Sequence, residues 1–542
     1  MAYDRFLIAP MRSGLITEIK AWQIPEDAFA RLNNAYIYKG TVRKRFGSQL
    51  MGGTNLSRQL DHLASRLRLQ VDTTDGAGAA SGTVPGDVFG KAQMFSIDDE
   101  IFTVSANGTP AVMLTTGSAT THTFNSTTGA YVFTGAGATK KVYYYPSFPV
   151  MGIGHYEENK VDSNSTYALD TRFAYKYTSG FWERSGSVEF NGGDTNFFWI
   201  ANWAGITDDL IAMFITNFNA TIGTPVAADD DPMYSFDGTT WSEFAPVFRV
   251  LASVPDGIVK TAKIVLPFKD RLVLLNTTEF NVTGNVNTQH VNRCRYSRNG
   301  TAFPANGTNN AEASVSSAGL WKKDDTAWTV GATTKKYEGA GFLDAPVEEE
   351  IMSAEFIKDR LIVYFERSTW ELAATGNQAD PFTWLKINTE LGTKSLKSPV
   401  PFDKAIITIG RTGIHGCSGA NVSKINEKIS DITFEIRESS NGTERIAGIR
   451  DYFTELAYWS FPSINAHEDS QTYPDKVLIY NYVNDSWGTA DDCITAFGYF
   501  EEQTGVSWES TELTWEQSNF KWDSGSTQSS FRQVIAGNQH GF

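Results

Sequence analysis

Short runs of alternating apolar and polar residues dominate this chain, and long helical patterns are scarce. Examples are "AYVFTG", "KVYYYP", "DRLIVYF" and "KVLIYNYV", which are separated by turns rich in Gly, Asn and Asp. A period of two places successive side chains on opposite faces of a strand, and Gly, Asn and Asp favour tight turns. The pattern therefore predicts an all-β fold made of many short strands.

Two segments near the N-terminus depart from this alternation. Leucines recur at a three-to-four spacing in residues 55–70, which predicts an amphipathic helix. Residues 24–40 could supply a second short helix, because Pro25 suits a first helical turn and acidic residues follow it. We expect residues 1–70 to form a docking segment that combines a short helix with a basic β-strand.

A stretch rich in Gly, Ala and Thr, residues 71–88, separates this segment from a group of short strands that ends near residue 146. We interpret residues 71–150 as a small, barrel-like β-domain inserted before the main body. The main body would then span residues 151–542.

An aromatic motif recurs in the main body. "YKYTSGFW", "YSFDGTTW" and "YNYVNDSW" fit one pattern, a Tyr followed seven residues later by a Trp, and "YSRNGTAF" keeps the spacing with Phe in place of Trp. The residues at the two ends of the motif are Tyr175 and Trp182, Tyr234 and Trp241, Tyr296 and Phe303, and Tyr480 and Trp487. The first three copies begin about 60 residues apart. A strand, a polar turn and a closing aromatic residue at this interval indicate repeated β-hairpins.

Repeated hairpins of this kind predict a β-propeller body with about six or more blades. Each blade is a small sheet that cannot cover both of its faces alone, so arrangement in a ring buries them. Two or more β-sandwiches with similar hairpins are the alternative. A second echo, "FKDRLVLL" and "IKDRLIVY", also indicates repetition.

The charge of the chain restricts the partners that it can have. The 542 residues carry a formal net charge of −16, which argues against a surface that coats DNA, because such surfaces neutralise phosphates. An acidic wall past which DNA slides is compatible with this charge. Three widely spaced cysteines predict no disulfide framework and a reducing compartment. We find neither a signal peptide nor a membrane-spanning run and expect no membrane insertion.

Four basic residues stand close together in this acidic chain: Lys39, Arg43, Lys44 and Arg45. A basic strand can be a solvated edge that discourages strand pairing, a contact with an acidic neighbouring subunit, or a contact with phosphate. We take these residues as candidates for docking to a subunit.

Residues with catalytic or metal-binding potential form no convincing constellation. His415 and Cys417 in "GIHGCSG" have no further ligands nearby, and we expect both to be packed inside a strand. The acidic run 229–231 lacks the spacing of a calcium loop, and we expect a solvated loop there. "SFDGTTW" is one residue short of the structural Asp-box of sialidases. We therefore predict no enzymatic activity, no metal and no cofactor.

Three segments resemble one family of virus proteins. They are "IPEDAFARLNNAYIYKGTVRKRFGS", "AEFIKDRLIVYFERSTWELAATGNQADPFTWLKINTELGTKS" and "IITIGRTGIHGCSGANVSKINEKISD". These segments resemble tail-nozzle proteins of short-tailed and crAss-like bacteriophages. The resemblance implies a structural virion protein assembled in the host cytoplasm as a ring, commonly of six subunits. Such a ring attaches below the portal and its adaptor, neighbours the tail fibres, and encloses the DNA exit channel.

Two other functions stay open at this point. The same blades could belong to a receptor- or glycan-binding tail protein, which would need an exposed aromatic pocket. A polysaccharide depolymerase would need two carboxylates at a fixed separation, and the sequence alone cannot place such a pair.

Overall fold

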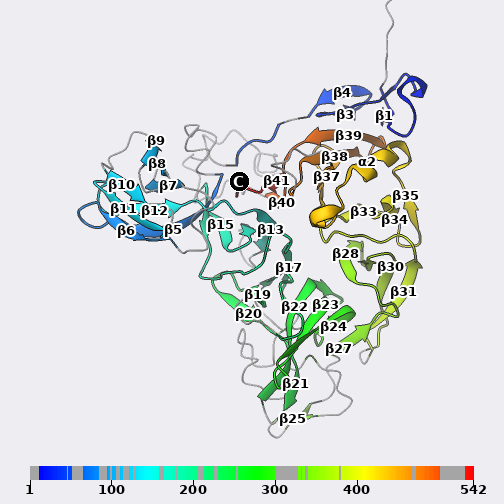
Figure 1. Cartoon of the computed structure of the whole chain (residues 1–542). Coiled ribbons are helices and arrows are strands. Elements are labelled where there is room, and N and C mark those ends of the chain that lie inside the picture. Colours follow the sequence, from blue (N-terminus) through cyan, green and yellow to red (C-terminus); the bar gives the residue numbers. More distant parts are fainter. Residues whose placement is uncertain are drawn as a thin grey trace, which may run out of the picture.

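A computed structural model gives the fold of the chain (Figure 1). The described residues are 11–45, 47–51, 65–84, 94–97, 100–104, 110–113, 121–125, 128–157, 164–178, 180–205, 211–224, 230–251, 254–300, 302, 321, 328–330, 333–335, 340–377, 380–464, 472–500 and 532–542. Strands account for 52% and helices for 3% of the structure, so the predicted all-β class is confirmed.

Most of the strands belong to a succession of antiparallel sheets that follow one another along the chain. The first sheet contains β13 (Val150–Glu157), β14 (Asn164–Asp170), β15 (Ala174–Thr178) and β16 (Phe181–Arg184). The second contains β17 (Trp199–Trp203), β18 (Ala212–Thr216), β19 (Met233–Phe236) and β20 (Trp241–Phe244). The third contains β21 (Val247–Leu251), β22 (Val254–Phe268), β23 (Arg271–Asn281), β24 (Val286–Tyr296) and β27 (Gly341–Asp344).

Three further four-stranded sheets and a hairpin follow. The fourth sheet contains β28 (Ile351–Ile357), β29 (Arg360–Phe365), β30 (Thr369–Ala374) and β31 (Phe382–Asn388). The fifth contains β32 (Val400–Pro401), β33 (Ile406–Gly410), β34 (Gly413–Cys417) and β35 (Val422–Lys424). The sixth contains β36 (Ala447–Asp451), β37 (Leu456–Phe461), β38 (Lys476–Asn481) and β39 (Ser486–Asp491), and the hairpin contains β40 (Ala496–Phe500) and β41 (Gln533–Gly537).

The sheets are arranged so that one strand of each touches a strand of the next. β13 contacts β17, β17 contacts β22, and contacts continue in order through β28, β32, β36 and β40. β40 in turn contacts β13, so the series of contacts closes on itself, and Figure 1 shows the sheets placed around a common middle.

A small β-unit branches from the first sheet. Its strands are β5 (Leu67–Thr73), β6 (Ala80–Thr83), β7 (Met94–Ile97), β8 (Glu100–Val104), β9 (Pro110–Met113), β10 (Thr121–Phe124), β11 (Ala130–Thr134) and β12 (Lys141–Tyr144). β5 joins the two parts, because it pairs with β12 on one side and in parallel with β16 on the other. Aromatic rings fill its core, with Phe95 packed against Phe124, Phe133 and Tyr144.

The remaining elements among the described residues are short. They are β1 (Gly14–Leu15), β2 (Ala28–Phe29), β3 (Ala35–Tyr38), β4 (Thr41–Lys44), β25 (Trp328–Val330), β26 (Thr333–Lys335), the helix α2 (Ser430–Glu435) and three 3-10 turns, Ala21–Gln23, Glu427–Ile429 and Ser439–Asn441. The prediction of a helix within 24–40 is wrong, since β2 pairs with β1 and β3 pairs with β4 there. The predicted helix 55–70 lies mostly outside the described residues, and its last four residues belong to β5.

The second sequence echo marks equivalent turns of neighbouring sheets. Phe268 pairs with Arg271 across the turn from β22 to β23, and Ile357 pairs with Arg360 across the turn from β28 to β29. The strands that follow are buried along most of their length, as their continuous apolar runs predict. Lys269 of the first turn forms an ion pair of 3.6 Å with Asp359 of the second, so the two echoes lie side by side.

Candidate functional site

The basic hairpin β3–β4 lies along the outer edge of the sixth sheet. The backbone N–H of Asn34 donates to the carbonyl of Thr489 on β39 at 2.7 Å, and the N–H of Thr489 donates to the carbonyl of Leu32 at 2.9 Å. Close approach is possible because Gly488 has no side chain: a Cβ there would lie 2.7 Å from the carbonyl oxygen of Ala35. The N-terminal segment therefore extends this sheet by hydrogen bonding along its edge.

The apolar face of the hairpin is buried in the same core as two of the sheets. Leu32 and Ile37 pack in a cluster that includes Trp459 and Trp487 of the sixth sheet and Ile409 of the fifth. Burial of such side chains contributes roughly 1.5–3 kcal/mol each, so the hairpin is held firmly to the sheets.

Three of the four predicted docking residues project from this anchored hairpin. Lys44 is exposed, and the cationic groups of Lys39 and Arg43 lie 5.2 and 4.2 Å from the centre of the Tyr38 ring. Arg45 differs, because it forms an ion pair of 2.8 Å with Asp492 of its own chain. The structure thus leaves Lys39, Arg43 and Lys44 on one exposed hairpin and gives Arg45 an internal partner.

The N-terminal segment also differs from the rest of the chain in net charge. Residues 11–45 contain seven Lys and Arg and three Asp and Glu, which is a net charge of +4. Since the whole chain carries −16, the other residues together carry −20. One short basic segment is therefore attached to a strongly acidic body.

Three copies of the aromatic motif lie on the hairpin between the third and fourth strands of a sheet. The pairs on these hairpins are Tyr175 with Trp182, Tyr234 with Trp241, and Tyr480 with Trp487. In the first two hairpins the Trp is opposite the middle aromatic residue, Tyr177 or Phe236. In the third, Trp487 is opposite Tyr480 itself and stacks on it with ring centres 4.2 Å apart. The spacing is shared, but the register is not.

The fourth copy of the motif is placed differently. Tyr296 ends β24, where it is opposite Val273 of β23 and Gly341 of β27, and its ring packs against Phe382. Phe303 lies outside the described residues. All of the described motif residues serve packing between strands.

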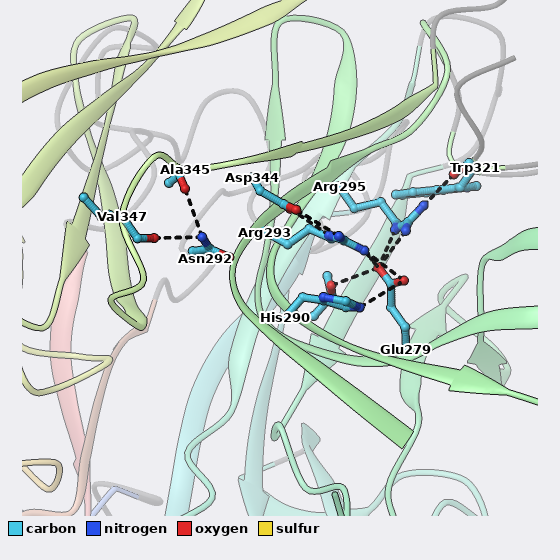
Figure 2. Close-up of polar contacts among 10 residues, drawn as sticks. Glu279, His290, Asn292, Arg293, Arg295, Trp321, Asp344, Ala345 and Val347 are labelled. Carbon is cyan, nitrogen blue, oxygen red and sulfur yellow. Dashed lines mark hydrogen bonds and ion pairs between the residues drawn. The ribbon is translucent and has the colours of Figure 1, made fainter. Parts of the chain in front are cut away.

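A group of charged side chains that contact one another lies in the third sheet (Figure 2). Glu279 on β23 is buried and accepts hydrogen bonds from Arg295 at 2.6 and 3.0 Å and from Arg293 at 3.2 Å. His290 approaches the same carboxylate at 3.6 Å. Arg293 also forms two bonds to Asp344 of β27, at 2.8 and 2.9 Å. We call these five residues the charge cluster.

The charge cluster is held together by opposite charges. Burial acts to raise the pKa of Glu279, but Arg295 and Arg293 outweigh it, and the pKa lies below its ordinary value. Hydrogen bonding from Arg293 lowers the pKa of Asp344. Burial lowers the pKa of His290, which favours the neutral ring. Both carboxylates are acceptors for arginine, so this arrangement suits the joining of β27 to β23 and β24 better than proton transfer.

The charge cluster does not stand out in the sequence. Glu279 follows a run of threonines in β23, and Arg293 and Arg295 alternate with Asn292 and Cys294 in β24, as on a solvated strand face. Their burial depends on β27 and Trp321, whose carbonyl accepts a bond of 2.8 Å from Arg295. Alternating opposite charges on adjacent strands are a signal that could have suggested the pairing.

The acidic run 229–231 is not a solvated loop where the structure describes it, so that expectation is wrong. The carboxylate of Asp231 accepts bonds from Asn191, Asn217 and Asn219, and the carboxylate of Asp230 accepts bonds from Thr221 and Asn287. Both aspartates are buried. Their bonds link the connections that follow β16 and β18 to strand β24. Asp229 lies outside the described residues.

The other residues considered for chemistry lie in the core. His415 and Cys417 are buried in β34, where burial lowers the pKa of His415 to about 4 and raises the pKa of the Cys417 thiol. A protonated thiol is a poor nucleophile and metal ligand. Within the described ranges, no group of three or more His, Cys, Asp and Glu residues is placed to hold a metal ion. Of the helices described, none is both long and apolar enough to cross a membrane.

Side chains meet across the middle of the closed series of sheets. The amine of Lys397, just before β32, lies 4.8 Å from the ring centre of Trp199 on β17, in a sheet that is not adjacent to it. Arg445, just before β36, forms an ion pair of 3.2 Å with Asp194, which precedes β17. Side chains from sheets on opposite sides of the series are therefore in contact at these two places.

Comparisons with known proteins add little to this picture. No family model and no curated protein matches the chain. Among solved structures, a chain of the BBS1N–ARL6DN complex has a TM-score of 0.31 at 10% identity over 65% of this chain and 86% of that one. A prolyl endopeptidase structure has a TM-score of 0.29 at 10% identity over 77% and 52%, and apo AztD from Citrobacter koseri has 0.28 at 8% over 82% and 98%. Similarities this low support no argument about fold or function.

Proposed function

We propose that the closed series of sheets is a β-propeller, in which each sheet is one blade. The contacts between strands of successive sheets, the antiparallel order within each sheet, and the return contact from β40 to β13 support this architecture. The six sheets and the β40–β41 hairpin would give seven blades. In this proposal residues 1–70 are the docking segment, 71–150 the inserted β-domain, and 151–542 the propeller body.

We further propose that the protein is a structural subunit of a bacteriophage tail nozzle or neck. Several copies, six by the family resemblance, would form a ring in the virion tail that contacts adaptor and portal-side proteins and the tail fibres. DNA would pass through a channel between the copies without specific binding. The net charge of −19 on residues 151–542 supports this, because an acidic wall repels the DNA backbone.

The separation of charge along the chain is the observation that carries this proposal. A hairpin with Lys39, Arg43 and Lys44 projects from a body that is strongly acidic, and it is anchored by backbone hydrogen bonds and a shared core. Fixed basic groups on an acidic protein suit an acidic partner subunit, since complementary charges guide and orient association.

Our proposal puts the channel between the copies, because side chains meet across the middle of the sheets of one chain. With Trp199 and Lys397 in contact across the series, a single propeller would serve as a solid wall unit. The DNA conduit would then lie where copies face each other around a common axis.

Electron microscopy of the purified full-length chain, alone and with adaptor protein, tests the proposal. We expect closed rings, and we expect the protein to be present in purified virions. A chain that stays monomeric under all conditions and is absent from virions would contradict the proposal.

A further inference from the structure

An aromatic cluster stands at the end of the sixth sheet that carries the basic hairpin. The guanidinium group of Arg450 lies 4.6 Å from the ring centres of Tyr452 and Tyr482 and 5.0 Å from that of Phe402. Tyr499 of β40 lies beside Tyr452, with ring centres 6.0 Å apart. Connections from the fifth and sixth sheets and β40 therefore converge on one arginine.

Large apolar side chains at this end are turned into solvent. Phe453 is 76% exposed, Val483 is 63% exposed and Tyr452 is 50% exposed. They occupy the turn from β36 to β37 and the turn from β38 to β39. These turns are neighbours, because Leu456 pairs with Asn481 where the turns begin and end.

The geometry of these turns does not require apolar residues at their tips. In each turn the side-chain oxygen of the first residue accepts hydrogen bonds from two backbone N–H groups of the turn. Asp451 accepts from Phe453 and Thr454. Asn481 accepts from Val483 and Asn484. An Asx residue stabilises such a turn whatever side chains follow it.

A third turn of the same form shows that the tip can be polar. Residues 281–286 connect β23 to β24 with the same four-residue loop, and Asn285 has a positive φ at the position equivalent to Glu455 and Asp485. Its third residue is Thr283, where the other two turns have Phe453 and Val483. Of these three turns, the two of the sixth sheet therefore have an apolar residue at the third position and the turn of the third sheet does not.

The aromatic cluster is continuous with the basic hairpin. The carbonyl of Ile37 on β3 accepts bonds from the side-chain amides of Asn481 at 2.9 Å and Asn484 at 3.3 Å. Val42, opposite Ile37 on β4, is itself 45% exposed. A centre of aromatic rings around Arg450 thus adjoins a rim that bears Lys39, Arg43 and Lys44.

We infer that this composite surface binds a second copy of this chain. Protein interfaces have cores enriched in Tyr, Phe and Arg and polar rims, which matches the composition here. Charge indicates the occupant: a basic rim complements the acidic body of another copy, whose residues 151–542 carry a net charge of −19. A contact between two different surfaces of identical chains can close into a ring. The inference rests on the proposed function and names the contact that builds the ring.

Substitutions at the turn tips test the inference. Phe453→Thr copies the residue found at the equivalent position 283, and Val483→Thr does the same in the neighbouring turn. Val282→Thr, at an exposed apolar residue of the third sheet's turn, is the matched control. Self-association of the full-length variants is measured by sedimentation velocity over a concentration series, with thermal melting as the check on folding.

We expect Phe453→Thr to weaken self-association at least tenfold, Val483→Thr to weaken it less, and Val282→Thr to leave it unchanged, with one melting temperature for all. The loss from Phe453→Thr should persist in high salt, because apolar contacts are not screened. Wild-type association by the Phe453→Thr variant would overturn the inference.

The same samples separate this inference from the proposed function. Rings that persist in electron micrographs of Phe453→Thr would refute this contact and leave the nozzle proposal standing. A wild-type chain that neither associates nor occurs in virions would refute both. A third outcome is a monomeric wild-type chain that binds a glycan array and loses this binding in Phe453→Thr. That outcome would show that the surface binds sugar and would refute the inference that it binds a second copy.

Discussion

Arginine is used in opposite ways in the third sheet and at the end of the sixth. In the charge cluster, Arg293 and Arg295 are bound to carboxylates inside the chain, and Glu279 is 6% exposed. At the sixth sheet, Arg450 lies among aromatic rings and approaches a carboxylate only at 3.5 Å, that of the exposed Asp403.

The difference separates groups that hold the fold from groups available to a partner. Charges already paired within a chain have little left to offer a neighbouring molecule. Basic groups on an exposed hairpin, next to exposed aromatic rings, can gain hydrogen bonds and buried area from association. We therefore expect the third sheet to contribute to stability, and our proposal places the contact between copies at the end of the sixth.

Removal of Glu279 should have the largest effect on stability. Glu279→Ala leaves Arg295, which is 2% exposed, without its carboxylate, and an uncompensated buried charge costs about 3–5 kcal/mol of folding free energy. Urea unfolding of the full-length chain measures this loss. A loss below about 1 kcal/mol would contradict the claim that the cluster stabilises the third sheet.

Acid should weaken the third sheet through the same carboxylate. Because the pKa of folded Glu279 is below its ordinary value, the ion pairs stabilise the fold at neutral pH, and this stabilisation is lost as pH falls below about 4.5 toward the folded pKa. We expect the urea midpoint of the wild type to fall more steeply with acid than that of Glu279→Gln. Equal slopes would show that Glu279 does not titrate with folding.

Charge reversal on the hairpin should affect assembly and not stability. Arg43→Glu with Lys44→Glu should weaken self-association about tenfold, or about 1.4 kcal/mol, because the rim would then repel an acidic neighbour. The unfolding free energy should change by less than about 0.5 kcal/mol, since both side chains are exposed. If the double variant sediments like the wild type, the hairpin is not part of the contact between copies.

The smallest effect is expected at Arg45. Asp492→Asn removes the ion pair of 2.8 Å, but the side chains of Arg45 and Asp492 are 18% and 23% exposed, so the loss should be about 0.2–1 kcal/mol. Self-association should stay at the wild-type level, because Arg45 faces its own chain. A tenfold loss of assembly would place Arg45 with Lys39, Arg43 and Lys44 in the contact.

The sequence predicted the hairpins better than their surroundings. Strand alternation and turn residues identified the echoes around Lys269 and Lys358, where local chemistry decides the structure. The helix expected within 24–40 failed because β3 gains more by lying against β39 and burying Ile37 than a short isolated helix would gain.

The residues of the third sheet's charge cluster and of the surface at the end of the sixth sheet could be predicted only in part. The basic hairpin stands out in an acidic sequence, and the structure places three of its four residues at the surface. The burial of the charge cluster and of Asp231 could not be predicted, because the strands and loops that cover them are distant in sequence. The aromatic cluster around Arg450 likewise depends on which connections the sheets bring together.

Electron microscopy of the full-length chain tests the central claim most directly. The proposal predicts closed rings with an open channel between the copies. In these rings the basic hairpin and the adjoining end of the sixth sheet of each copy contact the body of the next. Separate particles of the size of one chain, at every concentration and in the presence of adaptor protein, would contradict it.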